Sequence, residues 1–197
     1  MTDVHIAWKL GGWGLDYPDD AWRRTMAETL AALDAESMPV RRLGKALREL
    51  MAVDPDALRQ QYVELFDFHP RRSLALTYGE YGDRRERGAV LWALVRRLEA
   101  AGFEPMPGHL GDEIPLLLEY CAESGDREVA ARIGVVLRRL VETIPERSPY
   151  RDLMEALVES LPAGAATRAE EAETLGADDP DDVPFPLHDP EGEATVL

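Results

Sequence analysis

The amino-acid sequence predicts an all-α fold, a single compact bundle of about seven to eight helices followed by a disordered acidic C-terminal tail. Apolar residues recur at intervals of three, four and seven residues in one segment after another. No segment keeps the period of two that a strand requires, and no hairpin signal interrupts the helical repeats. The 197 residues suffice for one domain, which we place at residues 1–162, with the tail at residues 163–197.

Capping residues locate the first helices. Residues 4–15 mix large apolar side chains with three glycines and favour a short helix. Asp19 and Asp20 can cap a second helix, which runs to about residue 36. A third helix is expected to begin at Pro39. A fourth is expected at Asp54-Pro55, where an N-cap residue is followed by a proline in the first turn. The apolar stripes of the last three are Trp22, Met26, Leu30 and Leu33; Leu43, Leu47, Leu50 and Met51; and Leu58, Tyr62, Leu65 and Phe66.

Residues 74–88 read as a loop that runs into a helix with an unusual start. Asp83, with Glu86 three residues later, is typical of an N-cap, so we expect the helix to begin near Arg84 and end at Gly102. Three arginines then occupy the first turn, at the positive end of the helix dipole, where acidic side chains are preferred. The expected core stripe is Leu91, Leu94, Val95 and Leu98.

The phase of this helix turns Arg87 toward the core, because it lies four residues before Leu91. We expect it to pair with a buried carboxylate, either Asp67 or Glu119, or to cap backbone carbonyls; a recognition site at the helix entrance is the alternative. Gly88 costs about 1 kcal/mol relative to alanine inside a helix. A glycine at this position is expected if another backbone segment or a ligand must approach the helix closely there.

The last three helices follow clear signals. One begins near Asp112 with Pro115 in its first turn, and it is apolar nearly all round, so we expect it in the middle of the bundle. Cys121 on this helix is expected to be a buried, inert thiol. The final two helices begin at Gly125-Asp126 and Ser148-Pro149. Their stripes are Val129, Ile133, Val136, Leu137, Leu140 and Ile144, and Leu153, Leu157 and Leu161.

Composition and charge exclude several classes of function. A formal charge of -16 argues against nucleic acid as a partner and favours a basic peptide or protein surface. The single cysteine can form neither an intrachain disulfide nor a thiolate zinc site, and the four histidines lack metal-ligand spacing. No run of about 18 apolar residues occurs, so we expect a protein that stays in the cytoplasm and does not insert into a membrane. We also expect a monomer that binds no metal or cofactor stably.

The tail differs from the rest of the chain. It holds ten acidic residues and one arginine, a net -9 of the chain's -16, and is expected to be disordered. Its apolar island, residues 183–187, could dock on a partner or on its own domain, whereas a solvated tail without function is the simpler interpretation.

Aromatic residues gather around the 74–88 stretch. Tyr62 and Phe66, four residues apart on one helix, are expected to pack in the core. Tyr78 and Tyr81 fall in what reads as an irregular loop with glycines, where they could line a groove.

Several short motifs resemble one family. They are Tyr62-Val63-Glu64-Leu65-Phe66-Asp67, Ser73-Leu74, Leu76-Thr77-Tyr78, Gly82-Asp83, Arg87-Gly88, Ile114-Pro115, Leu118-Glu119-Tyr120 and Ser148-Pro149-Tyr150. Together they look like the nitrate reductase molybdenum cofactor assembly chaperones, the NarJ branch of the NarJ/TorD redox-enzyme maturation proteins. The likeness runs from about Leu15 to Leu161. Two departures are Thr77-Tyr78-Gly79 in place of a phenylalanine-glutamate-histidine run and Asp112-Glu113 in place of an aspartate-histidine pair.

The resemblance implies a non-enzymatic helical chaperone. Its partner would be the catalytic (alpha) subunit of a nitrate reductase, bound through the N-terminal peptide of that subunit before membrane docking, and it would assist insertion of the molybdenum cofactor. Proteins of molybdenum cofactor biosynthesis are further expected partners.

The peptide groove is expected between residues 74–88 and the helix at 112–120. Its predicted peptide-binding residues are Tyr62, Phe66, Tyr78, Tyr81, Asp112, Glu113 and Glu119. Its predicted shaping residues are Gly82, Asp83, Arg87, Gly88 and Pro115.

Three rival functions stay open. The client could be a different molybdoenzyme, or the chain could be a general helical adaptor. A helical hydrolase or metal enzyme would need converging histidine or carboxylate ligands.

Overall fold

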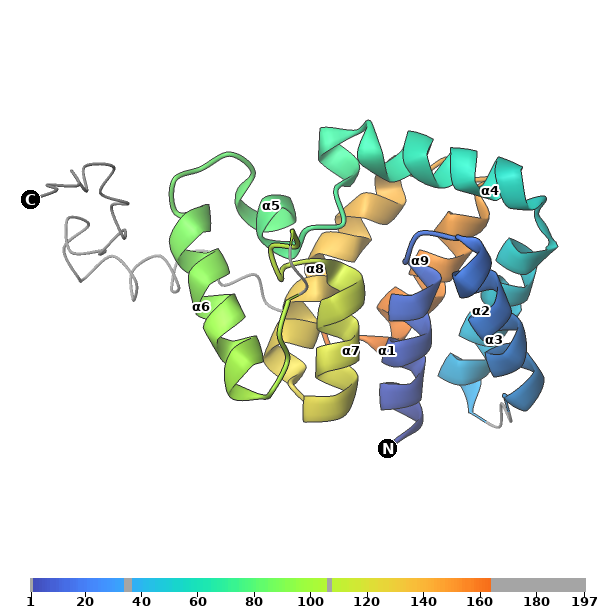
Figure 1. Ribbon diagram of the computed structural model, residues 1–197, viewed down its shortest axis with the longest axis horizontal. Coiled ribbons are helices and arrows are strands. Elements are labelled where there is room, and N and C mark those ends of the chain that lie inside the picture. The colour runs from blue at the N-terminus through green and yellow to red at the C-terminus, as the bar shows by residue number, and fades with distance from the viewer. Residues whose placement is uncertain (1, 34–36, 106–107, 164–197) are drawn as a thin grey trace, which may run out of the picture. The chain divides into compact units, whose positions relative to one another are not determined.

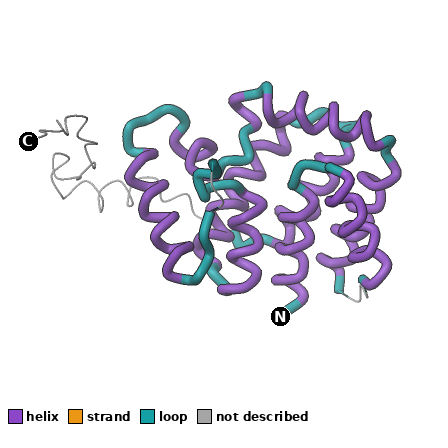
Figure 2. Tube along the Cα trace, viewed as in Figure 1, coloured by secondary structure: helices purple, strands orange, loops and turns teal. Residues whose placement is uncertain are grey.

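The computed structural model describes residues 2–33, 37–105 and 108–163, and within these ranges the chain is helical with no β-strand (Figures 1 and 2). The helices are α1 Asp3–Gly14, α2 Asp20–Ala32, α3 Met38–Ala52, α4 Pro55–Tyr62, α5 Leu76–Tyr81, α6 Arg87–Ala100, α7 Ile114–Ser124, α8 Arg127–Thr143 and α9 Pro149–Ser160. A π-helical turn, Val63–Asp67, prolongs α4, and a 3-10 turn follows at Pro70–Arg72. The all-α prediction is confirmed.

The N-terminal helix lies at the centre of the bundle rather than at its edge. α1 packs against α7, α3 and α9, with α7 as its most extensive neighbour (Figure 1). Trp8 is fully buried, and its indole Nε1 donates a hydrogen bond to the carbonyl of Ser160 at 3.1 Å. The last turn of α9 is thereby fastened to the first half of α1.

Glycines explain how α1 can be so closely surrounded. A Cβ at Gly12 would lie 2.9 Å from the carbonyl oxygen of Pro115 on α7, too close for any other residue without movement of the backbone. A Cβ at Gly14 would meet the side chains of Leu47 and Leu153 at 2.7 and 2.8 Å. The glycines that weaken the helical signal of this segment are therefore the residues that allow its neighbours to approach.

Three of the expected helix starts are confirmed by side-chain caps. Asp19 accepts a hydrogen bond from the backbone N–H of Trp22, Asp54 caps α4, and Asp126 caps α8. The expected stripes of α8 and α9 are buried, whereas only Met26 of the expected α2 stripe is buried. α7 is an interior helix that packs on both α1 and α8.

The expected start of α6 is wrong. α6 begins at Arg87, and no side chain caps it. Residues 76–81 form the short helix α5, so residues 82–86 are needed to turn the chain from α5 to α6, with Gly82 at a φ of +60°. Asp83 lies exposed in that turn, and the arginines Arg84 and Arg85 precede the helix instead of forming its first turn.

The buried face of α6 is Val90, Leu94 and Leu98. Leu91 and Val95, which we expected in the core, are only partly buried. Arg87 is partly buried at the start of the same helix, as its inward position predicted, with 26% of its side chain exposed.

The predicted C-terminal tail falls outside the described residues, together with its apolar island. Among the described helices, none has both the length and the apolar character needed to span a membrane.

Candidate functional site

Two backbone hydrogen bonds bring the two motif-rich stretches together. The N–H of Leu76 donates to the carbonyl of Asp112, and the N–H of Ile114 donates to the carbonyl of Leu74, both at 2.8 Å. The pairing has the geometry of an isolated antiparallel bridge between Ala75 and Glu113. It places the start of α5 beside the start of α7, and the side chain of Asp112 beside Thr77.

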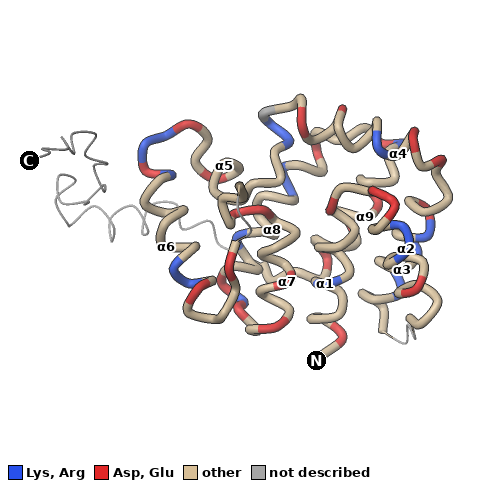
Figure 3. Tube along the Cα trace, in the orientation of Figure 1, with Lys and Arg blue, Asp and Glu red and all other residues tan. Residues whose placement is uncertain are grey.

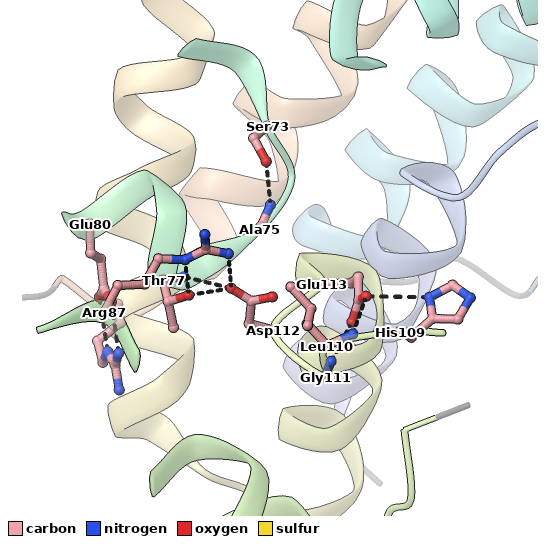
Figure 4. A network of polar contacts seen from close by, with 11 residues as sticks. Ser73, Ala75, Thr77, Glu80, Arg87, His109, Leu110, Gly111, Asp112 and Glu113 are labelled. Carbon is pink, nitrogen blue, oxygen red and sulfur yellow. Dashed lines mark hydrogen bonds and ion pairs between the residues drawn. The ribbon is translucent and has the colours of Figure 1, made fainter. Parts of the chain in front are cut away.

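A buried polar network forms at this junction (Figure 4). Only 1% of Asp112 is exposed, and its Oδ2 accepts hydrogen bonds from the backbone N–H of Thr77, at 3.2 Å, and from the Thr77 hydroxyl. Arg87 donates from Nε to the same hydroxyl at 3.1 Å, and its Nη2 lies 3.7 Å from Asp112 Oδ2. We call Thr77, Arg87 and Asp112 the Asp112 network.

Arg87 therefore has a different partner from the two that the sequence suggested. Asp67 is exposed, and Glu119 forms an ion pair with Lys9 at 3.3 Å. The guanidinium of Arg87 also lies over the ring of Tyr78, 5.3 Å from its centre. The bridge between Ala75 and Glu113 brings Asp112 to the start of α6, and no local sequence pattern specifies that bridge.

Glu113 holds the loop that precedes α7. Its carboxylate accepts from the backbone N–H groups of Leu110 and Gly111 at 3.1 and 2.9 Å, and His109 Nδ1 lies 3.3 Å away (Figure 4). Gly111 has a φ of +83°, which favours glycine. Asp112 and Glu113 thus both have internal partners, and their role in peptide binding stays a prediction.

A second polar contact attaches α5 to α8. Arg132 donates from Nε and Nη2 to the two carboxylate oxygens of Glu80, at 2.9 and 2.7 Å. Both side chains are mostly buried. This two-point contact joins α5 to α8, one of the two helices against which α5 packs.

The predicted groove residues near α5 differ in exposure. Tyr78 and Tyr81 lie on α5 rather than in a loop; Tyr81 is buried, and Tyr78 is partly exposed beside Arg87. Gly88 is exposed, and no atom lies within 4 Å of the position that a Cβ would take. The described residues therefore provide no close neighbour that would require glycine there. Pro115 is placed in the first turn of α7, as expected.

Tyr62 and Phe66 are placed elsewhere, in a cluster of rings with Tyr17 and Tyr150. Adjacent rings meet edge to face at 5.0 to 5.9 Å between centres. Phe66 is buried, as core packing predicted, and the hydroxyl of Tyr62 donates to the carbonyl of Leu15 at 3.1 Å. We call these four residues the tyrosine cluster.

The charges of two carboxylates, Asp16 and Asp67, act on Tyr62 of this cluster. The turn between α1 and α2, which contains Asp16, is one of the acidic segments in Figure 3. Asp16 is exposed to solvent, yet desolvation by its surroundings, then repulsion from Glu119 and Asp19, raises its pKa to about 6. Burial, followed by the charges of Asp16 and Asp67, raises the pKa of Tyr62. The cluster is thus electrostatically coupled to several negative charges.

Sequence reasoning missed three members of these sites. Tyr17 and Asp16 lie at the end of α1, where no helical stripe singles them out, and Tyr150 was recognised only as part of a motif. The spacing of Tyr62 and Phe66 could have suggested an aromatic partner, but only the fold supplies Tyr150 from α9. Cys121 is buried, as expected, and burial raises the pKa of its thiol. The described residues contain no group of three or more potential metal ligands.

Comparison with known proteins gives consistent results. The family model described as nitrate reductase delta subunit matches residues 25–172. The chain is 29% identical over 168 residues to the "Probable nitrate reductase molybdenum cofactor assembly chaperone NarJ" of Bacillus subtilis (strain 168), covering 81% of this chain and 90% of that protein. It is 31% identical over 186 residues to the "Nitrate reductase molybdenum cofactor assembly chaperone NarJ" of Escherichia coli (strain K12), covering 88% and 76%.

A longer relative carries a similar region. The chain is 31% identical over 157 residues to the "Nitrate reductase-like protein NarX" of Mycobacterium tuberculosis (strain ATCC 25618 / H37Rv). That match covers 77% of this chain but 24% of the longer protein.

Proposed function

The chain belongs to the nitrate reductase delta subunit family, and we propose that it is an assembly chaperone for a respiratory nitrate reductase. It binds the catalytic (alpha) subunit through the N-terminal peptide of that subunit, before the molybdenum cofactor is in place. It assists insertion of the cofactor, delays membrane docking of the subunit, and acts in the cytoplasm. It works by binding and catalyses no reaction.

The similarity to the two NarJ proteins supports this proposal most strongly, because each match covers most of both chains. Charge adds support: residues 1–162 carry -7 of the chain's -16, since the tail carries -9, so the helical domain attracts a basic segment. Exposed aromatic surface on the same domain, such as Tyr17 with 45% of its area accessible, suits an amphipathic segment.

The Asp112 network takes a positioning role in this proposal. It fixes α5 and the 82–86 turn against α7, so that Tyr78 and the partly exposed Arg87 form a rigid edge for the partner. A rigid edge reduces the entropy lost on binding. Asp112 itself is too buried to reach a partner without leaving Thr77.

A genetic experiment tests the function. We expect deletion of the gene from its native host to abolish nitrate reductase activity and to leave the catalytic subunit present but depleted in molybdenum. A plasmid copy of this chain should restore both. Unchanged molybdenum content of the purified subunit after deletion would contradict the proposal, and loss of a different molybdoenzyme would identify that enzyme as the client.

A further inference from the structure

The tyrosine cluster has features that packing alone does not explain. Exposure falls from Tyr17, at 45%, through the half-buried Tyr62 to Tyr150, at 1%. The rings of Tyr62 and Tyr150 are 5.9 Å apart, and Phe66 closes the inner side at 5.4 Å from Tyr150. The cluster therefore leads from the surface at the α1–α2 turn to the start of α9.

The hydroxyl of Tyr150 at the inner end is buried and has no hydrogen-bond partner in the structure. A buried polar group without a partner costs about 1–3 kcal/mol. The hydroxyls of Tyr62 and Tyr17 are close enough to add to the effect of burial in raising its pKa. A phenylalanine would fill the same volume without this cost, so the hydroxyl is better explained by a group that it meets only in a complex.

The charges near Tyr17, at the exposed end of the tyrosine cluster, indicate that the group bound in the complex is a cation. Asp16 is exposed beside Tyr17, and desolvation by its surroundings, followed by repulsion from Glu119 and Asp19, raises its pKa, so these surroundings disfavour its negative charge. Lys9 already pairs with Glu119, and a cation beside Asp16 would relieve the repulsion that remains among these carboxylates. Aromatic faces next to a carboxylate attract cations for a second reason, the negative potential over each ring.

The local backbone also departs from a regular helix. Phe66 lies in the π-helical turn Val63–Asp67, directly after Tyr62. Such turns occur frequently at functional sites, because the extra residue re-aims side chains that a regular α-helix would point elsewhere.

We propose that Asp16 and the tyrosine cluster bind an arginine or lysine side chain of the partner's N-terminal segment, with Tyr17 turning aside and the Tyr150 hydroxyl accepting a hydrogen bond from the cation. This site rests on the proposed function, because the partner segment is the peptide of the client. The cation would fix one point of the amphipathic peptide at the tyrosine cluster. Tyr17 is the member suited to move, since it lies in a turn and is the most exposed.

The test is calorimetric titration of the full chain with a synthetic N-terminal peptide of the cognate catalytic subunit. We expect Asp16→Asn to weaken binding about tenfold and to make affinity less dependent on salt, because the charge-assisted contact is lost. We expect Tyr150→Phe to weaken binding about fivefold without lowering the thermal unfolding midpoint, since it removes a hydroxyl that is unpaired in the free protein. Replacing each arginine and lysine of the peptide in turn by glutamine should identify one whose loss is not additive with Asp16→Asn.

The matched control is Glu104→Gln, which removes one exposed negative charge from the loop after α6. It should leave affinity within twofold of the wild type. Wild-type affinity in both Asp16→Asn and Tyr150→Phe would overturn the cation site while leaving the proposed function intact. Failure of the peptide to bind the wild-type chain at low salt would overturn both the peptide-binding step and this site.

Discussion

Replacing Thr77 by valine tests whether the Asp112 network holds the structure together. The side chain of Thr77 is fully buried, and valine keeps its shape but lacks the hydroxyl that donates to Asp112 and accepts from Arg87. Of the contacts described for Asp112, which is 1% exposed, the Thr77 backbone N–H at 3.2 Å and the Arg87 Nη2 at 3.7 Å would remain.

The expected loss follows from these contacts. A hydrogen bond to a buried charged group contributes about 1.5–3 kcal/mol, and a neutral one about half as much. The side chain of Arg87 is about a quarter exposed, so water can replace the Thr77 hydroxyl as its hydrogen-bond partner. Loss of this bond therefore adds little to the change in the free energy of unfolding. We therefore expect Thr77→Val to lower the free energy of unfolding by about 2–3 kcal/mol, and the thermal midpoint by about 4–12 °C for a chain of this size.

Urea denaturation, with the slope of the transition unchanged, is the appropriate assay. Thr29→Val is a suitable control, because the Thr29 hydroxyl bonds only to the carbonyl of Thr25 within α2, and we expect it to cost less than about 0.5 kcal/mol. A loss below about 0.5 kcal/mol for Thr77→Val would refute the reasoning. If peptide affinity fell without any loss of stability, the network would be a contact surface rather than a support.

The remaining predictions concern packing, pH and reactivity. Gly12→Ala should lower the free energy of unfolding by about 1–3 kcal/mol, because the new methyl group would lie 2.9 Å from the carbonyl oxygen of Pro115. Gly88→Ala should raise it by about 0.5–1 kcal/mol, because open space surrounds that position. Thermal denaturation of both variants beside the wild type measures the two effects. The raised pKa of Asp16 means that its folded form binds a proton more readily than its unfolded form, so its contribution to stability should improve as the pH falls from about 7 to 4. Asp16→Asn should accordingly raise the unfolding midpoint at pH 7.5 and have almost no effect near pH 3.5. Cys121 should react with a thiol reagent only after denaturation, since the side chain is buried and its pKa is raised; rapid reaction of the native protein would contradict the buried position of α7.

The helical pattern could be predicted where a segment carries both a periodic stripe and a polar cap. Asp19, Asp54 and Asp126 each act as the cap that local chemistry indicates, because an N-cap depends on groups only two or three residues away. The central position of α1 was not predictable in this way. Its glycines weaken the local helical signal, and their use appears only when Pro115 and Leu153 lie against them.

The candidate site was predicted only in part for the same reason. Helical phase turned Arg87 inward, but its partner depends on a backbone bridge between Ala75 and Glu113, which no local pattern specifies. Asp83 resembles an N-cap in the sequence. In the structure it lies in the turn between the short helix α5, which ends at Tyr81, and α6, which begins at Arg87. Tyr150 meets Tyr62 through the packing of α9 on the rest of the bundle, a contact 88 residues apart in the chain.

The most direct measurement of the proposed chaperone function is the molybdenum content of the protein that the chain retains. A tagged full-length chain would be expressed in its native host and purified together with its bound partners, and the catalytic subunit in that fraction would be analysed for metal. We expect the retained subunit to lack molybdenum, and the mature enzyme from the same cells to show no binding. Equal binding of the mature enzyme, or no catalytic subunit in the fraction from cells that assemble nitrate reductase, would contradict the proposed function.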